Sequence, residues 1–239
     1  MKKILFLGLG HLGQHFLSQN KIHEVIGTRR KSDELETNLI EFSLGESWKA
    51  SKDFDVIIIS FPPVEEYSLK LQKLLDDLGP LNKVIFISST SVFGTGQINE
   101  DSMKVGHTSN AKELIECEKL ISQLDDYVIV RPGGLIDSKR HPKFFSKKMS
   151  KLSKSKTNVN LVHTSDVAAF LHYAIGHNII NEDFNLVCDD HPTKEEFYRS
   201  FNSAISFDSE NSELRIIDNS KSKNTGFTYH YSNLSWSKL

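Results

Sequence analysis

Short apolar runs alternate along the chain with longer stretches in which apolar residues recur every three or four positions. We expect strands at 3–7, 24–28, 56–60, 83–88, 127–131 and 184–187. Several of these runs are apolar at consecutive positions, as in Val56, Ile57, Ile58 and Ile59. An unbroken apolar run is typical of a strand that helices cover on both faces of a sheet.

The stretches between the runs have the spacing of amphipathic helices. One helix is expected to start near His11, two more cover 65–78 and 109–124, and another begins with Ser165 as its N-cap. Alternation of strands and helices predicts an α/β fold of the Rossmann type, a doubly wound parallel sheet with right-handed crossovers.

The regular alternation of strands and helices ends after residue 191. One short helix is expected at 194–202, followed by extended pieces at 213–218 and 229–231. We interpret residues 1–239 as a single Rossmann-fold domain. Within it, 137–160 and 190–239 are expected to form a small C-terminal substrate lobe over the cleft, at the carboxyl ends of the strands.

Composition narrows the class of protein. The 239 residues carry a net charge of -2, which gives no basic field for nucleic acid. No window has the roughly 20 consecutive apolar residues that span a bilayer. Cys117 and Cys188 are too few and too far apart for a disulfide framework. We therefore expect a cytoplasmic protein with a small-molecule substrate and no nucleic-acid or membrane partner.

A glycine motif follows the first expected strand and opens the first helix. Gly8 permits a tight turn, Gly10 lets the backbone approach a pyrophosphate, and Gly13 lets helix and strand pack closely. The helix N-terminus presents free N–H groups to the phosphates, including those of His11 and Leu12. The motif in this strand–turn–helix context predicts a dinucleotide site.

The end of the second strand indicates which dinucleotide is bound. Sites for NAD usually place an acidic residue there, which accepts from the ribose 2′-hydroxyl. This sequence has Thr28, Arg29 and Arg30 instead. Guanidinium groups suit a 2′-phosphate, so NADP is expected in preference to NAD; a surface arginine pair without a ligand is the alternative.

Four further segments resemble the extended short-chain dehydrogenase/reductase superfamily, the NAD-dependent epimerase/dehydratase family. The stretch 87–94 resembles the end of that family's fifth strand, and 131–135 the end of its sixth strand, beside the nicotinamide. The stretches 160–168 and 184–187 resemble its later helix start and its last strand. With the glycine motif, the resemblance spans roughly residues 1–200 in the family's order.

The resemblance implies a catalytic serine, tyrosine and lysine, of which one is missing here. Ser89 matches the hydroxyl position, and Lys112 is the candidate lysine. Four residues before Lys112 stands Thr108 in place of the tyrosine, and an aliphatic alcohol is a far weaker acid than a phenol. The chain therefore looks like an atypical member with an altered proton relay. Tyr67 is expected to be structural rather than a substitute.

The same resemblance implies the remaining site residues. Substrate contacts are expected from Thr90, from Arg140 and from His163. Arg140 lies in the loop after the sixth strand, where an exposed loop without a substrate is an equal alternative. For His163, a structural role beside a helix-capping Asp166 is the alternative. The complete expected cofactor site consists of Gly8, Gly10, His11, Leu12, Gly13, Thr28, Arg29, Arg30, Ser60, Phe61, Pro62, Ser88, Arg131, Pro132 and Gly133.

We expect no metal site, on the interpretation that none of the ten histidines pairs at His-x-x-x-His spacing on a convincing helix. The leading functional hypothesis is an NADP-dependent oxidoreductase or epimerase-like enzyme acting on a small hydroxyl- or carbonyl-bearing substrate, such as a sugar or nucleotide sugar. A non-catalytic regulatory protein that senses the dinucleotide is the alternative. A monomer or a homodimer is compatible with either hypothesis.

Overall fold

The computed structural model describes residues 1–31, 38–50 and 53–238. Seven strands form one sheet in the order β11-β7-β5-β4-β1-β2-β3, and every neighbouring pair is parallel. The order reverses between β1 and β4, which is the switch point where open parallel sheets bind ligands. The strands are β1 (Lys3–Leu7), β2 (Glu24–Arg29), β3 (Leu39–Glu41), β4 (Val56–Ile59), β5 (Lys83–Ile87), β7 (Tyr127–Pro132) and β11 (Glu182–Leu186).

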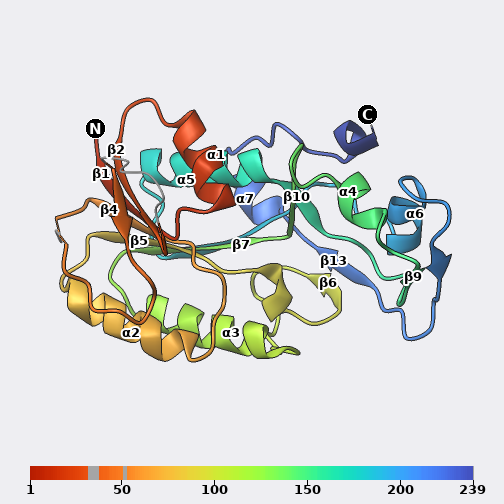
Figure 1. Ribbon diagram of the computed structural model, residues 1–239, viewed down its shortest axis with the longest axis horizontal. Coiled ribbons are helices and arrows are strands. Elements are labelled where there is room, and N and C mark those ends of the chain that lie inside the picture. Colours follow the sequence, from red (N-terminus) through yellow and green to blue (C-terminus); the bar gives the residue numbers. More distant parts are fainter. Residues whose placement is uncertain (32–37, 51–52, 239) are drawn as a thin grey trace.

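Helices cover both faces of this sheet (Figure 1). On one face α1 (His11–Gln19) packs with α5 (Thr164–Gly176), and their core includes the buried rings of Phe16 and Phe170. On the other face lie α2 (Tyr67–Leu78) and α3 (Ser109–Ile121), with Leu71 and Leu114 inside. The expected Rossmann-type α/β fold, a doubly wound parallel sheet, is confirmed.

Some local expectations were wrong. Strand β3 was not anticipated, because it is three residues long, lies at the sheet edge and has no fully buried side chain. The N-cap of α5 is His163 and not Ser165, since the imidazole Nδ1 accepts the backbone N–H of Ser165 at 3.2 Å. Residues 229–231 form no strand. The N–H groups of His230 and Tyr231 donate to the Asp166 carboxylate instead of to a ladder.

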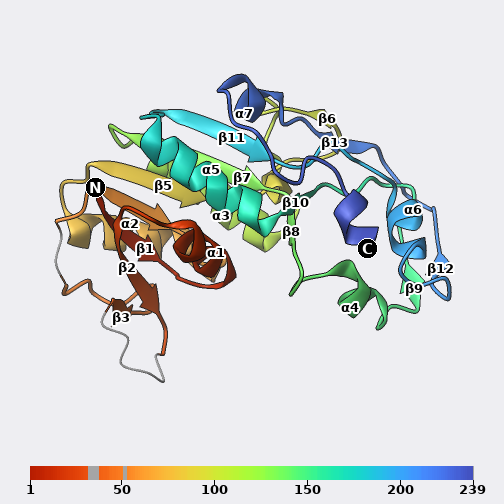
Figure 2. The ribbon, with the colours of Figure 1, turned by 90° about the horizontal axis from the view of Figure 1, so that it is seen from above.

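Three two-stranded parallel pairs and several short helices lie outside the main sheet. Figures 1 and 2 show α4, α6, β9 and β12 together beyond the carboxyl ends of the strands. The pairs are β6 (Gly96–Ile98) with β13 (Arg215–Ile217), β8 (Gly134–Ile136) with β10 (Leu161–His163), and β9 (Lys151–Leu152) with β12 (Ser206–Phe207). The short helices are α4 (Pro142–Ser146), α6 (Lys194–Arg199), α7 (Ser220–Asn224), η1 (Thr90–Val92) and η2 (Ser235–Lys238).

These outer segments share a small core of their own. Val159 and Phe197 pack there with Leu234, away from the helices that flank the sheet. The range 190–239 does not stay wholly in this region, because Phe227 and Tyr229 join the core of α1 and α5. The division of the chain into a sheet domain and a substrate lobe therefore remains a prediction.

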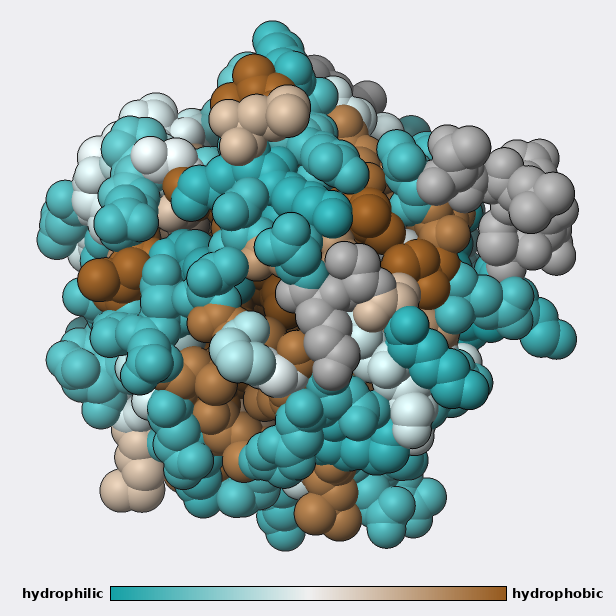
Figure 3. Space-filling view, turned by 90° about the vertical axis from the view of Figure 1, so that its left-hand side faces the viewer, coloured by the Kyte–Doolittle hydropathy of each residue, from teal (hydrophilic) through white to brown (hydrophobic). Residues whose placement is uncertain are grey.

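The surface of the molecule is mostly hydrophilic on the face shown in Figure 3. Hydrophobic side chains gather toward the middle of this face. Among the helices of the described residues, none has both the length and the apolar composition needed to cross a membrane. Cys117 and Cys188 are buried free thiols in separate cores, the first on the inner face of α3 and the second in the outer core.

Candidate functional site

The turn between β1 and α1 has the geometry of a phosphate-binding loop. Gly8 adopts φ +78°, a left-handed conformation that favours glycine, and a Cβ on it would lie 2.9 Å from the backbone oxygen of Ser60. The N–H of Gly8 donates to Thr28 Oγ1 at 2.9 Å, and the N–H of Leu9 donates to the Thr28 carbonyl at 2.8 Å. The turn is therefore held between the ends of β2 and β4.

The start of α1 leaves donors free for a ligand. Gly10 is the N-cap, and no side chain caps the helix there. A Cβ on Gly10 would meet nothing closer than the Gly8 carbonyl oxygen at 3.8 Å, so a ligand can approach the backbone. Gly13 packs tightly, because its Cβ would lie 2.7 Å from a methyl carbon of Leu9 and 3.2 Å from Phe6. The uncapped N–H groups at His11 and Leu12 and the helix dipole favour an anion at this end.

A cavity of about 530 Å³ extends from this turn over the ends of β2 and β3. Arg29 and Arg30 line it at the end of β2, together with Lys70 from α2. The Nε of Arg29 donates to the Leu9 carbonyl at 3.2 Å, which ties this guanidinium to the glycine turn. Among the described residues that line the cavity, none is acidic. The cavity therefore favours a ligand with several negative charges.

Three expected contacts follow β4. Phe61 and Pro62 line the cavity, and Ser60 contributes its backbone beside Gly8. Tyr67 is fully buried, and its hydroxyl donates to the Phe61 carbonyl at 3.3 Å. Burial raises the pKa of Tyr67 well above its usual value, so this phenol is a structural group, as expected.

A second cavity, of about 410 Å³, lies at the ends of β5 and β7. Ser89 and Thr90 line it from one side and Gly133 from the other. The Ser89 Oγ accepts the backbone N–H of Ser91 at 3.1 Å, so the hydroxyl proton remains available to a ligand.

Arg215 also lines this cavity, and the sequence did not indicate it. The guanidinium donates to the Thr90 carbonyl at 2.7 Å and to the Gly94 carbonyl at 3.1 Å. Asn160, another lining residue, accepts from and donates to the backbone of β13 and so holds this strand in place. No carboxylate in the described ranges forms an ion pair with Arg215.

The expected catalytic set is only partly assembled. Thr108 is exposed, and its Oγ1 caps α3 by accepting the N–H of Ala111 at 3.1 Å. Lys112 is exposed, and neither residue lines the cavity of Ser89. Thr108 therefore caps α3 outside the cavity of Ser89, and the catalytic roles expected of Thr108 and Lys112 remain predictions.

Ser88 and Arg131, both expected at the cofactor, are instead engaged with a buried carboxylate. Arg131 is fully buried and donates to Glu118 at 2.8 and 3.0 Å, while Ser88 Oγ donates to Glu118 at 2.5 Å. Lys104 and Asp183 complete the network, at 2.7 Å from Glu118 and 2.6 Å from Arg131 respectively. The Ser88 hydroxyl and two of the three guanidinium nitrogens of Arg131 are therefore engaged within the fold, whereas the buried Nη1 of Arg131 has no partner among the described residues. The cofactor contact expected of these two residues remains a prediction.

The neighbouring Pro132 is buried, whereas Gly133 is constrained by its surroundings. A Cβ on Gly133 would lie 2.5 Å from the Asn160 carbonyl oxygen. The glycine therefore lets β7 pass close to the chain before β10, and its surface faces the Ser89 cavity. The contact expected of it remains a prediction.

The expected substrate residues are not gathered in one place. Thr90 lies in the Ser89 cavity, whereas Arg140 is exposed and lines a different hollow with Lys139 and His141. His163 caps α5 and stacks on Tyr231 with ring centroids 3.8 Å apart. Burial lowers the pKa of His163 to about 4, although Asp137 opposes the shift, so it is neutral near pH 7 and is no proton donor there.

Asp166 has a different partner from the expected one. Its carboxylate does not cap α5 but accepts the N–H groups of His230 and Tyr231 at 3.0 and 2.9 Å. His163 therefore has the structural part that the sequence left open, and Asp166 fastens the C-terminal segment to α5.

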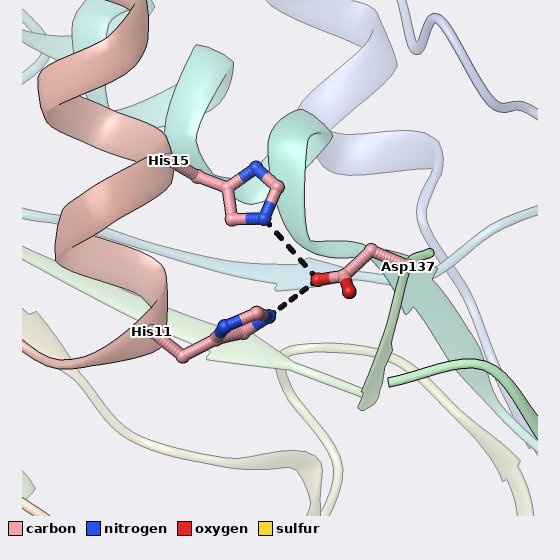
Figure 4. Close-up of side chains that lie close together, drawn as sticks. All are labelled: His11, His15 and Asp137. Atoms are coloured by element: carbon pink, nitrogen blue, oxygen red, sulfur yellow. Dashed lines mark hydrogen bonds and ion pairs between the residues drawn. The ribbon is translucent and has the colours of Figure 1, made fainter. Parts of the chain in front are cut away.

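Three side chains meet between α1 and the segment after β8 (Figure 4). The Oδ2 of Asp137 lies 2.5 Å from His11 Nε2 and 3.2 Å from His15 Nε2. One ligand atom from each residue lies within 4.8 Å of the other two. His11 and His15 are four residues apart on a helix, so the interpretation that no such pair exists was wrong. The spacing of the two histidines could be read from the sequence, but the position of Asp137 beside them could not.

Asp137 is almost fully buried and firmly held. Its Oδ1 accepts the backbone N–H groups of Lys139 and Arg140, both at 2.9 Å. Burial would raise the pKa of Asp137, but hydrogen bonds from Thr164, the Arg140 backbone and His11 together outweigh burial and hold it below its usual range. The carboxylate is therefore charged over the whole neutral range.

Solved structures of known proteins share this fold over nearly the whole chain. UDP-N-acetylglucosamine 4-epimerase from Bacillus cereus is 18% identical with a TM-score of 0.78, covering 100% of this chain and 94% of its own. The human epimerase family protein SDR39U1 (isoform 2), solved with NADPH, is 16% identical with a TM-score of 0.73, covering 99% and 97%. dTDP-glucose 4,6-dehydratase from Bacillus anthracis, solved with NAD, is 14% identical with a TM-score of 0.76, covering 97% and 93%.

These likenesses define the class of fold: the chain has the fold of NAD(P)-binding epimerase and dehydratase structures. No protein-family model matches the sequence, and no curated protein matches it either. The resemblance drawn from the glycine motif and the later segments is thus confirmed at the level of the fold, while substrate and reaction are matters for a proposal.

Proposed function

We propose that this protein binds NADP in the cavity at the glycine turn and acts as an oxidoreductase or epimerase-like enzyme of the epimerase/dehydratase type. The observation that carries the proposal is the pairing of an uncapped helix N-terminus with Arg29 and Arg30 in one cavity of about 530 Å³. The first feature suits a pyrophosphate, and the second suits a 2′-phosphate.

The residues present fit the dinucleotide. Gly8 and Gly10 leave the space that the pyrophosphate backbone contact needs, and Arg29 is already oriented by its bond to Leu9. Phe61 and Pro62 provide an apolar wall. When bound, the nicotinamide supplies a hydride acceptor or donor for a hydroxyl or carbonyl substrate.

The substrate is expected in the Ser89 cavity. Ser89 would donate its hydroxyl proton to the substrate oxygen, and the polar lining from Thr90 and Asn160 favours a polar ligand. Arg215 gives the cavity a positive charge that no carboxylate of the described chain neutralises. A half-buried cation is stabilised by an anionic ligand, so we expect a substrate that carries a carboxylate or a phosphate.

Replacing Arg215 with methionine is expected to lower kcat/KM for anionic substrates by about 10- to 100-fold, as for loss of a hydrogen bond to a charged group. NADPH binding should stay unchanged, since Arg215 lines a different cavity from Arg29. The measurement is NADPH consumption with carbonyl compounds that do or do not carry an anionic group. Arg199→Met, at an exposed arginine of α6, is the control. Equal effects of both variants would contradict the proposed substrate contact.

One observation favours a second candidate, a regulatory protein that senses the dinucleotide without catalysis. Thr108 caps a helix and Lys112 is exposed, so no proton relay is assembled around Ser89 by these two residues. The polar cavity of about 410 Å³ favours the enzyme, because a sensor needs no second binding space.

Titration of the purified protein with NADPH and NADH, followed by nicotinamide fluorescence, tests the proposal. We expect saturable binding of NADPH and weaker binding of NADH. Turnover of any carbonyl substrate would then distinguish the enzyme from the sensor. Absence of binding for both nucleotides would overturn both candidates and leave only the fold.

A further inference from the structure

The cluster of His11, His15 and Asp137 has the chemistry of a metal-binding site. Neutral imidazole and carboxylate are the ligands that zinc and related divalent transition metals use in proteins, and two histidines with one carboxylate are a recurrent ligand set. The histidines stand one helical turn apart on α1, so both rings project from the same side of the helix. Asp137 faces them from the segment after β8 (Figure 4).

We propose that His11 Nε2, His15 Nε2 and Asp137 Oδ2 bind a divalent transition metal ion, with zinc as the expected ion and water at the remaining position. The three residues are not among those that line the dinucleotide cavity or the Ser89 cavity, and only the backbone N–H of His11 is shared with the proposed dinucleotide site. The metal site can therefore be tested separately through His15 and Asp137.

One of the two separations from Asp137 matches that of a metal site, and the other requires a small movement of a ring. In a tetrahedral site with metal–ligand bonds of about 2.0–2.1 Å, neighbouring ligand atoms are about 3.3–3.4 Å apart. The separation of Asp137 Oδ2 from His15 Nε2 is 3.2 Å, close to that value. The separation from His11 Nε2 is 2.5 Å, so this ring would move outward by slightly under ~1 Å to admit the ion.

Backbone hydrogen bonds fix the orientation of the Asp137 carboxylate, which a simple surface ion pair does not require. Two backbone N–H groups hold Asp137 Oδ1, which leaves Oδ2 directed at the histidines. Outer hydrogen bonds of this kind orient the ligands of metal sites. The Asp137 side chain is 2% exposed, whereas those of His11 and His15 are 24% and 26% exposed, so an ion and a bound water have access from the histidine side.

An ion at this place would link two segments that are far apart in the sequence. His11 also belongs to the turn whose backbone N–H groups face the expected pyrophosphate, and Asp137 begins the chain that leads to α4. A metal ion would join the first turn of α1 to the segment after β8 across 126 residues of sequence. It would stabilise the folded state by mass action, since the unfolded chain does not hold the three groups together.

The test uses full-length protein freed of metal by a chelator and then titrated with Zn²⁺ in competition with a chromophoric chelator. Wild-type protein is expected to bind one equivalent. His15→Gln and Asp137→Asn should each weaken binding more than about 100-fold, beyond the loss typical of outer-shell changes. His177→Gln, at an exposed histidine of the same protein, is the matched control and should bind as wild type does. Co²⁺ in place of Zn²⁺ should give visible absorption bands that the Asp137→Asn variant lacks.

Two outcomes would overturn the proposal: no stoichiometric Zn²⁺ binding by the wild type, or equal binding by His15→Gln and His177→Gln. His15→Gln keeps the test decisive if Asp137→Asn fails to fold, because it alters a partly exposed ring and leaves the held carboxylate in place. An NADPH titration of His15→Gln separates this proposal from the proposed function, since nucleotide binding should be retained when metal binding is lost.

Discussion

Replacing Glu118 with glutamine is expected to lower the free energy of unfolding by about 3–5 kcal/mol, as for a buried ion pair that loses one partner. Arg131 is fully buried and donates two hydrogen bonds to this carboxylate. A glutamine amide would direct donors toward Arg131 and Lys104, and Asp183 alone would then compensate the buried guanidinium. Urea unfolding of the two proteins measures the difference.

Glu116→Gln is the matched control, because Glu116 lies on the same helix with an exposed ion pair to Lys119 and should change stability by less than about 1 kcal/mol. Burial would raise the pKa of Glu118, but Arg131 and Lys104 outweigh burial and lower it. Glu118 thus stabilises the fold above its unfolded pKa, and this stabilisation is lost as pH falls through the folded pKa. The difference in the free energy of unfolding between wild type and Glu118→Gln should therefore become smaller as the pH is lowered. A constant difference, or equal loss in both variants, would contradict the ion-pair account.

Replacing Arg29 with glutamate is expected to weaken NADPH binding by about 30- to 1000-fold, the range found when one partner of a close charge pair is lost. The guanidinium would face the 2′-phosphate, and a carboxylate at the same place would repel it. NADH lacks that phosphate, so its affinity should change far less and the preference between the two nucleotides should reverse. Nicotinamide fluorescence during parallel titrations gives both constants.

Arg199→Glu makes the same charge change in α6, on an arginine that lies outside the dinucleotide cavity. It should leave both nucleotide affinities at the wild-type values. If Arg29→Glu weakened NADH and NADPH to the same extent, the residue would be supporting the glycine turn through its bond to Leu9 rather than selecting the 2′-phosphate.

Much of the fold was predictable because its causes are local. The run Val56–Ile59 is buried along its whole length, as an unbroken apolar strand under two helical layers must be. The short edge strand β3 escaped prediction, because an edge strand has no such run. Residues 229–231 were misread because the Asp166 carboxylate of α5, and not a neighbouring strand, accepts their backbone N–H groups at His230 and Tyr231.

In the candidate site, too, features with local causes were predictable and features that depend on distant residues were not. The requirement for glycine is local at Gly13, where Leu9 and Phe6 of the same strand–turn–helix unit leave no room for a Cβ, and at Gly8, which has a positive φ. The further crowding of Gly8 by Ser60 comes from the end of β4 and was not readable from the motif. Arg131 was assigned to the cofactor on the pattern of its own segment, but its partner Glu118 lies on a different element. Nothing near residue 131 in the sequence reveals that pairing.

The sequence by itself determined the parallel α/β sheet, the glycine turn and the basic end of β2, because hydrophobic periodicity and the conformational freedom of glycine act over a few residues. Only the tertiary structure decided which polar groups meet: Arg215 with Ser89 at one cavity, and Asp137 with the histidines of α1. These contacts depend on how segments far apart in the chain pack together. No short sequence pattern predicts such packing.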